Sequence, residues 1–146
     1  MSEKFLLLLS GPNLNLLGDR EPELYGTETL EDFVDLARKT ALKRGLSLEH
    51  FQSNHEGEIV DAIHNAINKA EAIVINPGAF THYAWAIHDA LATFDGPVIE
   101  VHISNPAARE PWRHTSVVAS VSSGAVTGFG INGYRIAVEA VADMVT

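Results

Sequence analysis

The chain has 146 residues, of which 46% are hydrophobic and 20% charged, values typical of a globular domain large enough to bury a real core. Its formal net charge of −9 at pH 7 argues against nucleic acid as a partner, and the early apolar run Phe5 to Leu9 is too short for a membrane span or a signal sequence. The absence of cysteine excludes disulfides and thiolate sites and fits a reducing cytoplasm, where we expect the protein to work.

The first predicted strand spans residues 4–10 and is mostly apolar, which is typical of a central strand. Roughly sixteen residues, 11–26, then follow without helix or strand pattern, where two to six are usual between a strand and a helix. Gly18 and Gly26 bound the second half of this segment. We therefore expect it to form a lid over a ligand site at the end of the central strand.

Helices and strands alternate after this segment. Residues 29–32 resemble a capping box, and apolar spacing predicts a helix that stops at Gly45. Alternating apolar and polar residues over 46–52 are typical of a half-exposed edge strand. The pattern further predicts helices over 56–69, 82–93 (capped by Thr81) and 134–145, and strands over 72–76, 98–103 and 125–130.

Five strands that alternate with helices predict an α/β protein with a parallel sheet. Because the first strand is apolar and the second is not, we choose the flavodoxin-like order 2-1-3-4-5 in a three-layer α/β/α arrangement. No repeat, linker or low-complexity tract is visible. Residues 1–146 are therefore expected to form a single domain.

The predicted strand at 98–103 carries Glu100 and His102 within an otherwise apolar run. Residues two apart in a strand share a face, so the carboxylate and the imidazole should lie side by side near the carboxyl end of the strand, where open α/β sheets bind ligands. One interpretation is a structural pair that closes the sheet edge. The other is a general acid oriented by a carboxylate.

Three arginines, Arg20, Arg109 and Arg113, lie in predicted loops of this acidic protein. Because loops often carry sites, they suggest a local anion pocket, although each alone is equally compatible with a solvated surface charge. Tyr25 follows Arg20 by five residues on the proposed lid. A packing anchor is one role for it. The other is a base, because a neighbouring guanidinium favours the phenolate form.

A metal site is the first competing interpretation. The chain offers possible zinc or iron ligands, but their spacing matches no strong metal signature. We therefore expect no metal at these side chains, which are His82, His88, Asp89, Glu100 and His102.

A nucleotide-binding site is the second competing interpretation. Residues 128–133 match the dinucleotide pattern GxGxxG between a strand and a helix. That pattern belongs to a first βαβ unit, with an acid about twenty residues further on, whereas only thirteen residues follow Gly133. We expect tight packing of the last helix on its strand to explain the glycines. A non-catalytic flavodoxin-like module that binds a nucleotide here stays the alternative function.

Several short motifs are spread over essentially the whole chain. They are GPNLN at 11–15, REPxxYG at 20–26, NPGA at 76–79 with Thr81 and His82, Asp89, EVHISN at 100–105, and Arg109 with Arg113. A single one of these motifs would be weak evidence, but their combination is highly specific. With these motifs in family order and spacing, the sequence resembles the type II 3-dehydroquinate dehydratases.

The resemblance implies a cofactor-free anti elimination of water from 3-dehydroquinate, which yields 3-dehydroshikimate through an enolate, in the shikimate pathway or in quinate breakdown. It makes Tyr25 the base and Arg20 the cation that supports the phenolate. His102 becomes the acid that protonates the leaving hydroxyl, with Glu100 orienting its ring. Asn13 holds a water against the enolate oxygen.

The resemblance also implies substrate contacts and an assembly. The family forms a homododecamer, a tetramer of trimers, and a half-exposed second strand and Trp112 are available here for contacts between chains. Arg109 is expected to order the closed lid, and Asp89 to reach the site of a neighbouring subunit. The remaining implied substrate contacts are the backbone amides of Ile103 and Ser104, the Ser104 hydroxyl, and the side chains of Asn76, His82 and Arg113.

Overall fold

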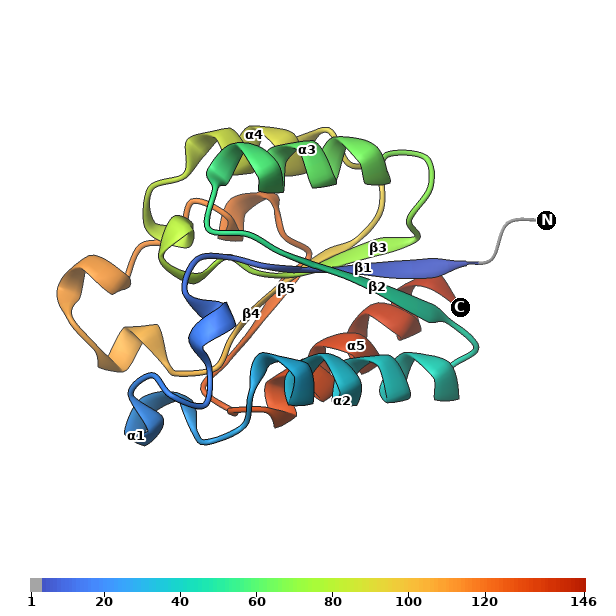
Figure 1. Cartoon of the computed structure of the whole chain (residues 1–146). Helices are drawn as coiled ribbons and strands as arrows, with labels where there is room; N and C mark the ends of the chain where they lie inside the picture. Colours follow the sequence, from blue (N-terminus) through green and yellow to red (C-terminus); the bar gives the residue numbers. More distant parts are fainter. Residues whose placement is uncertain (1–3) are drawn as a thin grey trace.

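The computed structural model describes residues 4–146 and contains a five-stranded, all-parallel sheet in the order β2-β1-β3-β4-β5 (Figure 1). This order confirms the prediction made from the apolar first strand. β2 lies at the edge of the sheet, where alternate side chains, those of Glu49 and Phe51, are exposed. The strands are β1 (Phe5–Ser10), β2 (Ser47–Gln52), β3 (Ala72–Asn76), β4 (Val98–His102) and β5 (Gly124–Thr127).

Helices cover both faces of the sheet (Figure 1). One apolar cluster joins the sheet to α2 (Leu30–Lys43) and α5 (Asn132–Val145), and the other joins it to α3 (Glu56–Ala66) and α4 (Trp85–Ala92). Side chains of β1 alternate between these two clusters, which is why the strand is apolar at nearly every position. None of the helices in residues 4–146 is long and apolar enough to span a membrane.

The predicted start of α2 is confirmed in detail. The Asp32 amide donates to the Thr29 hydroxyl at 3.2 Å, and the Thr29 amide donates to the Asp32 carboxylate at 3.0 Å, which completes the capping box. The helix ends at Lys43, and Gly45 beyond it has a φ of +76°. A left-handed glycine just after the last turn is the expected stop signal.

The predicted cap at Thr81 is wrong. Helix α4 begins at Trp85, and Thr81 lies in a preceding 3-10 helix, Gly78–His82. Its side chain is buried, and its hydroxyl donates to Glu100 instead of to a helix amide. Helix α3 is also shorter than predicted, because the chain leaves the helical conformation at Ile67.

The segment 11–26 contains two short helices that the sequence pattern did not predict. They are a 3-10 helix, Leu14–Leu16, and α1 (Pro22–Tyr25), each too short to show apolar periodicity. The segment is held down by the buried side chains of Leu14, Leu17 and Tyr25, which join the cluster under α2. It therefore packs against the body of the protein.

The glycines of the segment 128–133 have a different cause from the one expected. Gly128 and Gly130 have φ values of +89° and +58°, a backbone conformation that side chains rarely adopt. A Cβ added at Gly133 would lie 3.6 Å from the Val101 side chain, an ordinary contact. Backbone conformation at the first two glycines thus accounts for the motif, and tight helix packing does not.

Candidate active site

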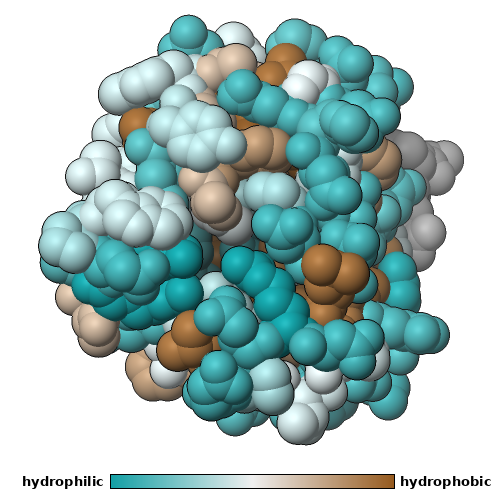
Figure 2. Space-filling view, turned by 60° about the vertical axis from the view of Figure 1, so that its left-hand side comes forward, coloured by the Kyte–Doolittle hydropathy of each residue, from teal (hydrophilic) through white to brown (hydrophobic). Residues whose placement is uncertain are grey.

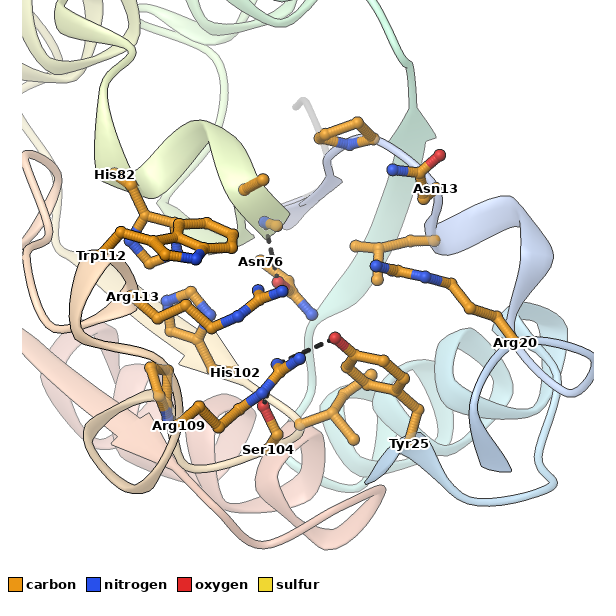
Figure 3. A pocket seen from close by; sticks show the side chains of 16 residues that line it. Asn13, Arg20, Tyr25, Asn76, His82, His102, Ser104, Arg109, Trp112 and Arg113 are labelled. Carbon is orange, nitrogen blue, oxygen red and sulfur yellow. Dashed lines mark hydrogen bonds between the residues drawn. The ribbon is translucent and has the colours of Figure 1, made fainter. Parts of the chain in front are cut away.

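A cavity of about 130 Å³ opens at the carboxyl ends of β1, β3 and β4 (Figure 3). Hydrophilic side chains surround a hollow on this side of the molecule (Figure 2). In this sheet, β1 and β3 flank the point where the strand order reverses, which is the usual ligand position in such folds. The family resemblance gives a role to twelve residues, and ten of them line the cavity. These are Asn13, Arg20, Tyr25, Asn76, His82, His102, Ile103, Ser104, Arg109 and Arg113.

Two loops at the base of the cavity touch backbone to backbone. The Gly11 amide donates to the Asn76 carbonyl at 2.8 Å, and a Cβ added at Gly11 would lie only 2.2 Å from the Pro77 carbonyl oxygen. No other residue than glycine fits at that position. The contact brings Asn13, whose φ is +68°, and Asn76 to the same wall of the cavity.

The carboxamide of Asn76 is fixed from behind. Its Nδ2 donates to the Tyr134 hydroxyl at 3.0 Å, and its Oδ1 accepts from the Gly78 amide at 3.1 Å. Tyr134 is fully buried, and burial raises the pKa of its phenol to about 12, so that it stays neutral. A rigid carboxamide thus presents its remaining donor and acceptor capacity to the cavity.

Glu100 and His102 form the pair that the strand pattern predicts. His102 Nε2 lies 2.5 Å from Glu100 Oε2, and His102 lines the cavity while Glu100 is only 3% exposed. Burial acts to raise the pKa of Glu100, but hydrogen bonds from His102, Thr81 and Ser116 and the charge of His102 outweigh it and hold this pKa below its ordinary value. The carboxylate therefore stays ionised behind the imidazole.

Tyr25, at the end of α1, faces the cavity beside two arginines (Figure 3). Arg109 Nη1 donates to the Tyr25 hydroxyl at 2.9 Å and to the Ser104 hydroxyl at 3.1 Å. The guanidinium carbon of Arg20 lies 4.9 Å from the centre of the Tyr25 ring. The sequence assigned the role of phenolate partner to Arg20, whereas the hydroxyl itself is contacted by Arg109.

An aromatic and cationic wall closes the outer side of the cavity. The guanidinium of Arg113 lies 4.0 Å from the centre of the Trp112 ring, and Trp112 meets the His82 ring edge to face at 5.2 Å (Figure 3). Glu110 accepts a hydrogen bond of 3.0 Å from Arg113 Nε. Trp112, which the sequence offered for contacts between chains, is 54% exposed and lines this cavity.

Two of the singled-out residues lie outside the cavity. Glu100 sits behind His102, and Asp89 projects from α4 with 84% of its side chain exposed. Two histidines considered as possible metal ligands instead form hydrogen bonds with backbone carbonyls. His82 Nδ1 lies 2.7 Å from the Thr115 carbonyl oxygen, and His88 Nδ1 lies 2.7 Å from the Val117 carbonyl oxygen. Within residues 4–146, no three His, Asp or Glu side chains gather closely enough to hold a metal ion.

Comparison with known proteins identifies the family and the fold. The family described as dehydroquinase class II matches residues 4–142. The chain belongs to this family. The sequence is 54% identical over 140 residues to a catabolic 3-dehydroquinase of Emericella nidulans, which covers 96% of this chain and 92% of the relative. It is 52% identical over 133 residues to a 3-dehydroquinate dehydratase of Bacillus licheniformis, which covers 91% and 92%.

Solved structures of class II dehydroquinases have the same architecture. The type II dehydroquinase of Propionibacterium acnes superposes with a TM-score of 0.91 at 43% identity and covers 98% of both chains. The enzyme of Butyrivibrio crossotus superposes with a TM-score of 0.92 at 44% identity, covering 97% of this chain and 99% of the other. The resemblance inferred from the motifs is thereby confirmed, as is the parallel α/β fold.

Sequence reasoning missed three groups that support this dehydroquinase cavity. Ser116 and Tyr134 were not singled out, and Thr81 was given a helix-capping role. The one available signal was that a buried Glu100 and a buried Asn76 need hydrogen-bond partners. That rule demands donors and acceptors but does not say which of the many polar residues supply them.

Proposed function

We propose that the protein dehydrates 3-dehydroquinate to 3-dehydroshikimate, as its family and the names of its relatives suggest. One observation carries the proposal: the Tyr25 phenol and the His102 imidazole line the same cavity from different elements, α1 and β4 (Figure 3). A base and an acid on different walls are what an anti elimination requires. The same chemistry serves aromatic biosynthesis and quinate breakdown, and relatives of both kinds are named.

Tyr25 acts as the base in this proposal and removes the proton next to the substrate ketone. The Arg109 hydrogen bond to its oxygen and the Arg20 guanidinium near its ring both stabilise negative charge on the phenol. Arg109 also bonds Ser104, which ties the base to the loop after β4. A lid function of the segment 11–26, with Arg109 ordering it on closure, is part of the proposal.

His102 acts as the acid and delivers a proton to the departing hydroxyl. Its Nε2 is engaged with the ionised Glu100, so its other ring nitrogen, Nδ1, is the one that serves the substrate. The contact between Nε2 and the Glu100 carboxylate fixes the ring. Asn13, on the wall formed by the loop after β1, holds a water against the enolate oxygen.

The substrate is an anion, and the protein carries a net charge of −9. Three arginines on one cavity reverse that charge locally. We propose that the substrate carboxylate binds the backbone amides of Ile103 and Ser104 and the Ser104 hydroxyl. The ring hydroxyls and the carboxylate end are further held by Asn76, His82 and Arg113.

We also propose the homododecamer, a tetramer of trimers, in which Asp89 approaches the site of a neighbouring subunit. Its exposed position on α4, one turn after the exposed Trp85, supports a contact there. Light scattering should give a mass twelve times that of the chain, and a monomeric mass would refute this assembly.

We propose a cytoplasmic location for the protein, which the absence of cysteine supports.

The test of the function is a direct assay. The purified protein is incubated with 3-dehydroquinate in the presence of a metal chelator, and the absorbance of the conjugated enone is followed. We expect the absorbance to rise at the same rate with and without chelator. No increase, or a flavin or nicotinamide nucleotide retained through purification, would instead favour the nucleotide-binding alternative.

A further inference from the structure

We propose that Thr81 and Ser116 are positioning residues for the acid of the dehydration, because their hydroxyls fix the charge and the orientation of Glu100 behind His102. This inference rests on the function proposed above and extends it to two residues outside the substrate cavity. Neither side chain lines that cavity, and neither contacts the reacting atoms in the mechanism. They act through Glu100 alone.

Both oxygens of the Glu100 carboxylate are engaged. Oε2 lies 2.5 Å from His102 Nε2 and accepts from the Thr81 hydroxyl at 2.6 Å. The Ser116 hydroxyl lies 3.0 Å from each of the two carboxylate oxygens and 2.9 Å from the Thr81 hydroxyl. Hydrogen bonds to an ionised acceptor are about twice as strong as neutral ones, so two hydroxyl donors matter for a carboxylate this deeply buried.

The proton of Ser116 is directed by its own surroundings. The Val118 and Ala119 amides donate to the Ser116 oxygen at 3.2 Å and 3.0 Å. A hydroxyl has two lone pairs and a single proton, so these amides occupy its acceptor capacity and leave the proton for Glu100. The two amide hydrogen bonds polarise the Ser116 hydroxyl and thereby strengthen its hydrogen bond to the carboxylate.

Backbone contacts hold the two hydroxyls in place. The Val117 amide donates to the Thr81 carbonyl at 2.7 Å, which joins the 3-10 helix after β3 to the segment that precedes β5. On the next residue, His82 Nδ1 pairs with the Thr115 carbonyl. The junction thus orients Thr81 toward Glu100 on one side and His82 toward the substrate cavity on the other.

The consequence for catalysis follows from the balance at Glu100. Burial opposes its ionisation, and the hydroxyl donors are part of what overcomes burial. Without them the proton shared with His102 moves toward the carboxylate, so the ring becomes a neutral imidazole and its remaining N–H is a weaker acid. In the part of the chain that the structure describes, the other charged or titratable groups on the second cavity bordering this pair are Arg113 and His114, and neither replaces a hydroxyl donor.

The experiment compares Thr81→Val and Ser116→Ala with Thr81→Ser, which keeps the hydroxyl. Steady-state kinetics with 3-dehydroquinate are measured over a pH series. We expect kcat to fall about tenfold in Thr81→Val and Ser116→Ala, less than the 10²–10⁴-fold that a general acid itself supplies, with KM changed less than about threefold. Because the pair then holds its shared proton more tightly, the alkaline limb of the kcat profile should move to higher pH, and Thr81→Ser should keep the wild-type profile.

A second measurement separates this proposal from the proposed function. The His102 Nε2 proton, held in a short bond to a carboxylate, should give a strongly downfield NMR signal whose position changes in Thr81→Val and Ser116→Ala and stays the same in Thr81→Ser. Active wild type with unchanged kcat, profile and NMR signal in both variants would overturn the positioning role alone. Wild type without turnover would overturn the proposed function, while the NMR signal still decides the role of the hydroxyls. If Thr81→Val does not fold, Ser116→Ala supplies the same comparison.

Discussion

The Tyr25 hydroxyl accepts a hydrogen bond of 2.9 Å from Arg109, although 84 residues separate the two along the chain. The bond joins α1, in the segment after β1, to the loop after β4. Because Arg109 also donates to Ser104, it links the phenol oxygen to the proposed carboxylate site. The proposed base is thus held by both loops, which favours catalysis by positioning.

The first prediction concerns the base. Tyr25→Phe removes the hydroxyl and keeps the ring that packs in the core, so folding should be retained. We expect kcat to fall by at least about 10²-fold, the lower range for a general base, while a product analogue binds within a few-fold of its wild-type affinity. Tyr83→Phe, an exposed tyrosine outside the cavity, is the control and should keep full activity. Unchanged turnover in Tyr25→Phe would remove Tyr25 from the mechanism.

The second prediction concerns anion binding at the outer wall. Arg113→Ala removes a guanidinium that stacks on Trp112 and lines the cavity. A hydrogen bond to a charged group contributes about 1.5–3 kcal/mol, so KM should rise about ten- to hundredfold with a smaller change in kcat. Arg38→Ala on α2, whose side chain is 44% exposed, should leave KM unchanged. A normal KM in Arg113→Ala would refute the assigned contact.

Features that depend on residues close together in the sequence were predicted correctly. The pairing of Glu100 with His102 follows from the two-residue period of a strand, and the position of β2 follows from its alternating pattern. The capping box at Thr29 is equally local. Each of these needs only neighbouring residues and a repeating geometry.

The features that the sequence did not predict come from contacts without a repeating pattern. Thr81 precedes an apolar helical pattern, so it satisfied the rule for a cap, but the buried carboxylate of Glu100 competes for its hydroxyl. Ser116 reaches Glu100 from a segment of turns, and Tyr134 reaches Asn76 across 58 residues. No periodicity encodes such pairs, so they become visible only once the sheet is assembled.

The third prediction tests the support of Asn76. Tyr134→Phe removes the hydroxyl that accepts from Asn76 Nδ2 and leaves a buried donor unpaired. We expect a loss of about 1–3 kcal/mol in the free energy of unfolding and a lower thermal midpoint. KM should also rise, because the carboxamide is free to turn away from the cavity. Equal thermal midpoints for Tyr134→Phe and the exposed control Tyr83→Phe would contradict this role.

The fourth prediction concerns the free energy of unfolding at acid pH. As pH falls, we expect His50 on β2 to lower it before Glu100 does. His50 Nε2 lies 2.9 Å from the Ser10 hydroxyl, and burial, assisted by the charge of Arg38, lowers its pKa from 6.5 to about 4. The folded protein therefore binds fewer protons at His50 than the unfolded chain between these values. Stability should fall as pH falls from about 6.5 toward 4. Glu100 acts later, because its lowered pKa means that its contribution is lost only below the ordinary carboxyl range.

The measurement is the free energy of unfolding from urea titrations at several pH values between 7 and 4.5. One proton corresponds to about 1.4 kcal/mol per pH unit, and the partial exposure of His50 reduces its share to about 1 kcal/mol per pH unit. His50→Gln should flatten the decline by about that amount, whereas the exposed His64→Gln on α3 should keep the wild-type slope. A wild-type slope in His50→Gln would show that another group drives the acid transition.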